Sequence, residues 1–89
     1  MSDITLDKEL RKRKVVVADD NRDVNYVIKE ILCEYGFQVI QAFDGDEAIH
    51  AYFEEKPDLL LLDYRMPKMD GIDVLKHIKT KDPQAVVVL

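Results

Sequence analysis

Three short runs of consecutive apolar residues constrain the fold of this 89-residue chain more than any other feature. They are Val15–Ala18, Leu59–Leu62 and Val86–Leu89. Their apolar residues follow one another without polar alternation, which is typical of strands buried on both faces. Each gap between these runs contains helical patterns. The sequence therefore predicts parallel strands with helices packed over them.

Helical spacing is clearest after the first run. Asn21 is a candidate N-cap, and Gly36 is expected to end the helix as its C′ residue. The apolar side chains of this helix recur at i, i+3, i+4, i+7 and i+8, so they are expected to share one face of the helix: Val24, Val27, Ile28, Ile31 and Leu32.

The remaining elements follow the same alternation. A second strand is expected over residues 37–43, and Asp44–Gly45 is expected to turn the chain into a second helix that ends before Pro57. A third helix is expected from Gly71 to about Lys79, and a fourth strand over residues 85–89.

The order β-α-β-α-β-α-β predicts an α/β fold with a doubly wound parallel sheet. We expect the flavodoxin-like strand order 2-1-3-4. The sheet would be incomplete, since the sequence stops inside the fourth strand. Residues 14–89 are expected to form this partial domain, and residues 1–13 an N-terminal arm.

Composition narrows the class of protein. The formal charge of −5 argues against direct nucleic-acid binding. A single cysteine, Cys33, excludes an internal disulfide and fits a reducing compartment. We find no apolar run of membrane-spanning length and no signal-peptide pattern, so we expect no membrane partner and a cytoplasmic location.

Acidic residues follow two of the apolar runs directly: Asp19 and Asp20 after the first, and Asp63 after the second. Ligands of open parallel sheets bind beyond the carboxyl ends of the strands, where the winding reverses. A single aspartate there is more often a turn or capping residue. Three together would repel one another, and a bound Mg²⁺ would relieve that repulsion.

Two segments resemble the signatures of bacterial response-regulator receiver domains. They are Val15–Asn21 and Leu60–Gly71, the second with the specific string D-x-x-M-P-x-M-D-G. Asp44–Ala48 resembles the family's entry into its second helix. The resemblance implies a Mg²⁺-dependent phosphoacceptor of two-component (phosphorelay) signal transduction, with a histidine kinase or phosphotransfer protein as partner.

The resemblance also implies residue roles. Asp63 would accept the phosphoryl group. Asp20 and Asp63 would bind Mg²⁺ directly with the backbone carbonyl of Arg65, and Asp19 would act through water. The Arg65 side chain would either tune the lifetime of the phosphoryl group or be a loop cation facing solvent. Such a module would phosphorylate and dephosphorylate itself without being an enzyme that turns over a separate substrate.

The chain also departs from the family pattern. Complete receivers continue past the fourth strand to a Ser or Thr, a Lys and a further helix, strand and helix. We therefore expect an uncovered sheet face and an apolar strand edge in this chain. It should form a homodimer, exchange elements with a copy, or be a fragment.

Two other functions stay open at this point. A receiver-like interaction or assembly domain with little or no phospho-signalling would fit the missing segments. A Mg²⁺-dependent phosphohydrolase would also use an aspartate after a parallel strand, but it would carry an acid two residues later, where this chain has Arg65.

Overall fold

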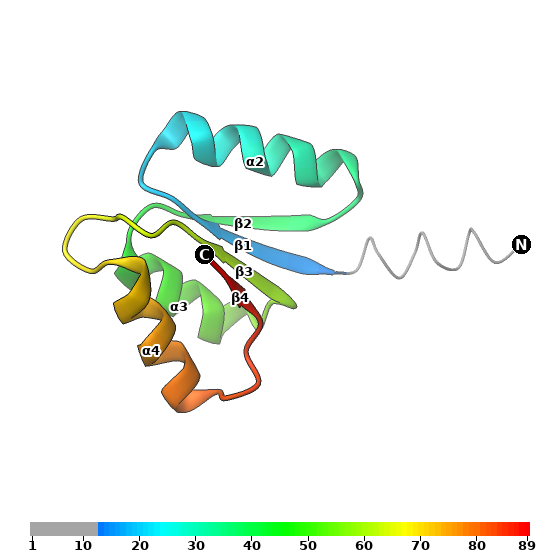
Figure 1. The fold of residues 1–89 in the computed structure, drawn as a ribbon. Coiled ribbons are helices and arrows are strands. Elements are labelled where there is room, and N and C mark those ends of the chain that lie inside the picture. The colour runs from blue at the N-terminus through cyan, green and yellow to red at the C-terminus, as the bar shows by residue number, and fades with distance from the viewer. Residues whose placement is uncertain (1–12) are drawn as a thin grey trace, which may run out of the picture.

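The computed structural model describes residues 13–89, so the expected arm falls almost entirely outside the described residues. Strands and helices alternate along the chain as predicted (Figure 1). Their bounds are β1 Lys14–Ala18, α2 Arg22–Glu34, β2 Gln38–Ala42, α3 Gly45–Glu55, β3 Leu59–Leu62, α4 Gly71–Lys81 and β4 Val87–Val88. None of the helices in this part of the chain is long and apolar enough to cross a bilayer.

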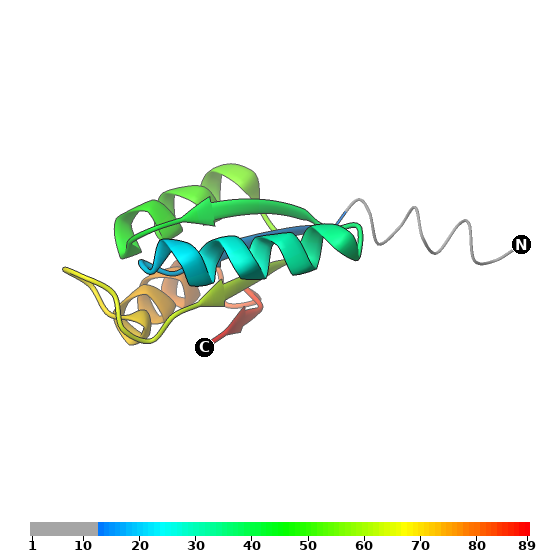
Figure 2. The same cartoon turned by 90° about the horizontal axis from the view of Figure 1, so that it is seen from above.

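The four strands form one parallel sheet in the order β2-β1-β3-β4. This confirms the predicted order and the doubly wound, flavodoxin-like fold class. Figures 1 and 2 show α2 on one face of the sheet and α3 with α4 on the other. In the central pair, β1 and β3 are in register from Val15 opposite Leu59 to Ala18 opposite Leu62. The two strands therefore end at the same level.

The hydrophobic core lies mainly between the sheet and the pair α3 and α4. Strand β1 is buried along its apolar run, as expected for a central strand covered on both faces. Leu60 from β3 and Ile78 from α4 are both fully buried. Burying a side chain of this size contributes about 1.5–3 kcal/mol. This side of the sheet therefore provides most of the stability that positions the strand ends.

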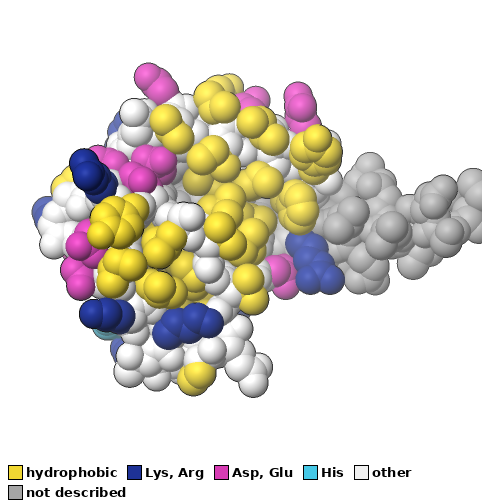
Figure 3. All heavy atoms as spheres, viewed as in Figure 1, with side chains coloured by type: hydrophobic (Ala, Val, Ile, Leu, Met, Phe, Trp, Pro, Cys, Tyr) yellow, Lys and Arg dark blue, Asp and Glu magenta, His cyan; other side chains and the backbone are white. Residues whose placement is uncertain are grey.

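The apolar face predicted for the first helix is only partly covered. Ile28 and Leu32 are partly buried, but Val24, Val27 and Ile31 are about half exposed. These three side chains lie on a flank of α2 that no other described element covers. Figure 3 shows hydrophobic side chains gathered on the face that runs from α2 across β3 and β4. We call this surface the apolar face; its exposed members are Val24, Val27, Ile31, Val86, Val88 and Leu89.

Other expectations need smaller corrections. The fourth strand covers only Val87–Val88 and pairs on one side, with β3. Asp44 is the N-cap of α3 and Gly45 its first residue, so the predicted turn leads directly into the helix. Cys33, near the end of α2, is exposed.

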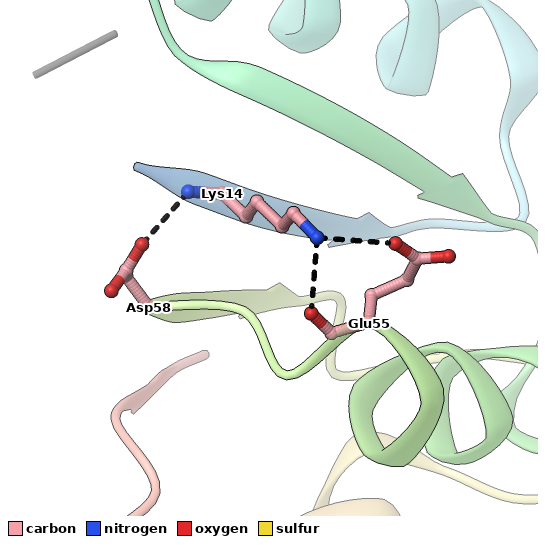
Figure 4. A network of polar contacts seen from close by, with 3 residues as sticks. All are labelled: Lys14, Glu55 and Asp58. Carbon is pink, nitrogen blue, oxygen red and sulfur yellow. Dashed lines mark hydrogen bonds and ion pairs between the residues drawn. The ribbon is translucent and has the colours of Figure 1, made fainter. Parts of the chain in front are cut away.

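Lys14 joins three elements at the amino end of the sheet (Figure 4). Its backbone N–H donates to the Asp58 carboxylate at 2.8 Å. Its Nζ lies 3.5 Å from Glu55 Oε1 and donates to the Glu55 carbonyl at 3.4 Å. These contacts fix the start of β1 against the end of α3 and the turn before β3.

Candidate metal centre

Asp19 follows β1 and Asp63 follows β3, and the parallel register brings both to one edge of the sheet. The backbone N–H of Asp63 donates to the Ala18 carbonyl at 2.8 Å, which extends the ladder of the two strands to Asp63 itself. Each of Asp19, Asp20 and Asp63 places one carboxylate oxygen within 4.8 Å of the others. The structure thus brings the three predicted acids together.

The three acids open onto a hollow of about 650 Å³ at this edge. Asp19 and Asp63 are partly buried, whereas Asp20 is exposed. Arg65 is also exposed and lines the hollow with Tyr64. The roles predicted for the Arg65 carbonyl and side chain remain predictions.

The turn between β1 and α2 has a local cause. Asn21 donates its backbone N–H to Asp19 Oδ1 at 2.9 Å. As the predicted N-cap, Asn21 accepts from the N–H groups of Asp23 and Val24 through Oδ1. Asp19 is thereby held by the residue that starts the helix.

All three described helices begin at this edge, and each has a polar N-cap: Asn21, Asp44 and Asp70. Asp44 accepts from the Glu47 N–H at 2.8 Å, while the Glu47 carboxylate accepts from the N–H of Phe43, the residue before the N-cap, at 3.0 Å, in a variant of the capping box. The sequence interpretation treated Asp44 as a turn residue. The pattern D-x-x-E from Asp44 to Glu47 was the signal it passed over.

The electrostatics of the cluster favour a cation. Partial burial raises the pKa of the Asp19 carboxyl above 3.8, the Asn21 N–H opposes that rise, and the charges of Asp63 and Asp20 add to it. Among residues 13–89, no Lys, Arg or His forms an ion pair with these acids. Three carboxylates without a cationic partner are the oxygen donors that Mg²⁺ prefers, so the residues present fit that ion.

Asn25 is a residue of this site that the sequence interpretation missed. It is fully buried, and it is the one buried polar side chain among the described residues. Its Nδ2 donates to the carbonyls of Ala42 at 2.9 Å and Asp19 at 3.0 Å, with Val17 O farther away at 3.4 Å. Its Oδ1 accepts from Gln41 Nε2 at 2.9 Å. The sequence contained a signal for this role, because Asn25 is a polar residue at helical spacing from the apolar Ile28 and Leu32.

Gly71, the first residue of α4, is needed for close packing rather than for its backbone angles, since its φ is not in the positive region. A Cβ at this position would lie 2.6 Å from the Asp63 carbonyl oxygen and 3.0 Å from the Tyr64 Cα. The start of α4 therefore passes directly against the backbone of Asp63.

Comparison with known proteins identifies the family. Residues 15–89 match the family model described as the response regulator receiver domain. The chain belongs to this family. Over 77 residues it is 40% identical to the chemotaxis protein CheY of Bacillus subtilis (strain 168), a match that spans 85% of this chain and 64% of that protein. It is 34% identical to sporulation initiation phosphotransferase F of the same organism over 80 residues, or 90% of this chain and 64% of the relative.

Solved receiver structures share the fold. The response regulator TrrA of Thermotoga maritima, in complex with Mg²⁺–BeF, superposes with a TM-score of 0.85 at 32% identity, covering 88% of this chain and 68% of that one. CheY of Borrelia burgdorferi, in a CheX–CheY–BeF₃–Mg²⁺ complex, gives 0.80 at 36% identity, covering 84% and 58%. The receiver chain thus spans about two thirds or less of these relatives.

Proposed function

We propose that this receiver domain accepts a phosphoryl group on Asp63 in a Mg²⁺-dependent reaction of two-component signal transduction. The observation that carries the proposal is the meeting of Asp19, Asp20 and Asp63 within 4.8 Å, in a chain of the receiver family. The donor would be the phosphohistidine of a histidine kinase or of a phosphotransfer protein. The compartment that the proposal assumes is the cytoplasm, where Cys33 would stay a thiol.

The proposed step is a displacement at phosphorus. An Asp63 carboxylate oxygen attacks the phosphorus atom, a P–O bond forms, and the P–N bond to the donor histidine breaks. The histidine nitrogen leaves with the electron pair and takes up a proton from solvent. The product is an acyl phosphate on Asp63, and water later returns it to carboxylate and inorganic phosphate. One chain accepts one phosphoryl group, so the domain is a switch rather than an enzyme.

Asp20 and Asp63 would hold the ion directly with the Arg65 carbonyl, and Asp19 would act through water. When bound, Mg²⁺ supplies positive charge against the phosphoryl oxygens, which is the main requirement of phosphoryl transfer. The hollow in front of the acids is open to solvent and to a partner's side chain. Two similar proteins have been solved with Mg²⁺ and a beryllium fluoride, which supports the choice of ion.

The test is chemical labelling. The protein is incubated with Mg²⁺ and acetyl phosphate, and intact-mass spectrometry follows a phosphate that hydroxylamine removes. We expect labelling of the wild type, none of Asp63→Asn, and wild-type labelling of Asp73→Asn, a carboxylate of the same edge outside the cluster. A label that survives in Asp63→Asn would overturn the assignment of the acceptor.

One observation favours a second candidate, an assembly domain with little or no phospho-signalling. The apolar face gathers six exposed hydrophobic side chains, and contiguous exposed apolar patches mark interaction surfaces. The labelling experiment separates the two functions: a protein that binds Mg²⁺ and takes up no label would favour assembly. Steady turnover of a phosphorylated substrate would instead favour a hydrolase.

A further inference from the structure

Asn25 connects α2 to the two strand ends beside the acidic cluster. Its Nδ2 contacts the carbonyl of Asp19 at the end of β1 and the carbonyl of Ala42 at the end of β2. The Ala42 carbonyl also accepts from the Asp19 N–H at 3.1 Å. The Asn25 amide therefore closes a small network at the carboxyl edge, and it does so in a place without solvent.

The carbonyl of Asp19 belongs to the peptide unit that joins Asp19 to Asp20. Since a peptide unit is planar, a hydrogen bond to its oxygen fixes the direction of both neighbouring residues. Asn21 already holds the Asp19 carboxylate from the other side. Without the Asn25 amide, the Asp19 carbonyl would lose this hydrogen bond. Only the contacts of the Asp19 carboxylate and the Asp19 N–H would then hold the segment in place.

Few side chains could replace this amide. The position requires an N–H donor for at least two carbonyls and an acceptor for Gln41 Nε2, within a fully buried volume. A carboxylate cannot donate when ionised, a hydroxyl donates once, and an apolar side chain does neither. The full use of both ends of the Asn25 side chain indicates a specific role rather than a tolerated polar residue.

We propose that Asn25 is a positioning residue of the metal centre, which orients the Asp19–Asp20 peptide unit so that both carboxylates face the Asp63 side chain. This inference rests on the proposed function, since the acids would be the groups around Mg²⁺. Groups that hydrogen-bond behind metal ligands typically change metal affinity by about 10–100-fold.

The experiment measures the dissociation constant of Mg²⁺ by calorimetric titration of the full chain. Asn25→Ala should weaken binding by about tenfold or more, and Asn25→Ser, which keeps one donor, by less. The control Ile78→Ala, which removes a buried side chain on the opposite face of the sheet, should keep the wild-type affinity. Wild-type affinity in folded Asn25→Ala would overturn the proposal.

A second measurement needs no variant and no metal. The chain has two asparagines, and the exposed Asn21 is an internal reference for the buried Asn25. In NMR spectra, the Asn25 side-chain amide protons should exchange with water much more slowly than those of Asn21. Equal exchange of the two would contradict the proposal even if Asn25→Ala did not fold.

The outcome separates this inference from the proposed function. A wild type that binds no Mg²⁺ would overturn the function, and the Asp20 amide chemical shift of the metal-free protein would then decide the role of Asn25. The Asp20 amide chemical shift should differ from the wild-type value in Asn25→Ser and should equal it in Ile78→Ala. An unmoved shift in Asn25→Ser would overturn the positioning role.

Discussion

Asp19 is subject to two opposing demands at the scale of single residues. As part of the proposed metal centre it would have to keep its charge, but its own partial burial and the charges of Asp63 and Asp20 make that charge unfavourable in the metal-free protein. Unit charges at such a separation repel by roughly 1 kcal/mol even in water. The cluster is therefore expected to reduce stability until a cation binds.

A substitution of Asp19 tests whether the acidic cluster lowers the stability of the metal-free protein. Asp19→Asn keeps an acceptor for the Asn21 N–H and removes one charge. We expect the free energy of unfolding without metal to rise by about 1 kcal/mol at pH 7, and the gain in stability on adding Mg²⁺ to shrink. Urea denaturation with EDTA and with Mg²⁺ measures both. Asp46→Asn, outside the cluster, is the control, and an equal gain there would contradict the prediction.

The close contact at Gly71 allows a prediction about the effect of one added Cβ atom. Gly71→Ala would place a Cβ 2.6 Å from the Asp63 carbonyl, and neither backbone can move freely. We expect a loss of about 1–3 kcal/mol in unfolding free energy, as for other overpacked sites. His77→Ala on the exposed side of the same helix should be nearly neutral. Thermal and urea denaturation compare the two, and a Gly71→Ala variant as stable as the wild type would show that the contact relaxes at little cost.

At the scale of elements, Tyr52 joins α3 to the end of α4. Its hydroxyl donates to Asp82 Oδ2 at 2.6 Å, and Asp82 is the C-cap of α4. Burial, together with the hydrogen bond and charge of Asp82, raises the pKa of Tyr52 to about 12. The folded state therefore holds this proton more tightly than the unfolded state, in which the pKa is about 10.

The sign of the pH dependence follows from that difference. The stabilisation is fully present below pH 10 and is lost as pH rises from about 10 to about 12. Tyr52→Phe should cost about 1–2 kcal/mol at pH 7, and its stability should depend less on pH in this window. Urea denaturation at pH 9, 10 and 11 tests the difference. Parallel pH curves for the two proteins would contradict the assignment.

The elements also show how far sequence reasoning reaches. The strand order was predictable because continuous apolar runs allow few arrangements, and the convergence of Asp19 and Asp63 follows from the parallel register. The exposure of Val27 was not predictable from spacing, because a helical stripe does not reveal how much of it a neighbour covers. Asn25 was overlooked for a related reason: its role depends on Ala42, which lies 17 positions away.

For the whole molecule, the apolar face is the feature with the clearest consequence in solution. Its exposed side chains lie beside a hollow of about 210 Å³ whose lining includes Ile28, Val88 and Leu89. The edge of β4 adds unpaired backbone groups. We expect the 89-residue chain to self-associate through this surface, as a homodimer or by exchange of elements.

Light scattering after size exclusion checks this expectation. The wild type should exceed the monomer mass of 10.3 kDa. The double variant Val27→Lys with Ile31→Lys should shift toward the monomer, since both side chains are about half exposed and contribute little to the core. The matched control is Lys29→Arg. A monodisperse wild-type monomer that unfolds cooperatively would contradict self-association.

The common starting edge of the three helices gives the molecule an electrical polarity. Acidic residues outnumber basic ones there, with Asp19, Asp20, Asp23, Asp44, Asp46, Glu47, Asp63, Asp70 and Asp73 against Arg22, Arg65 and Lys68. The negative potential at this edge would therefore orient the domain as it approaches a cationic surface, so that this edge makes the first contact. Such an encounter would slow as added salt shortens the reach of the field.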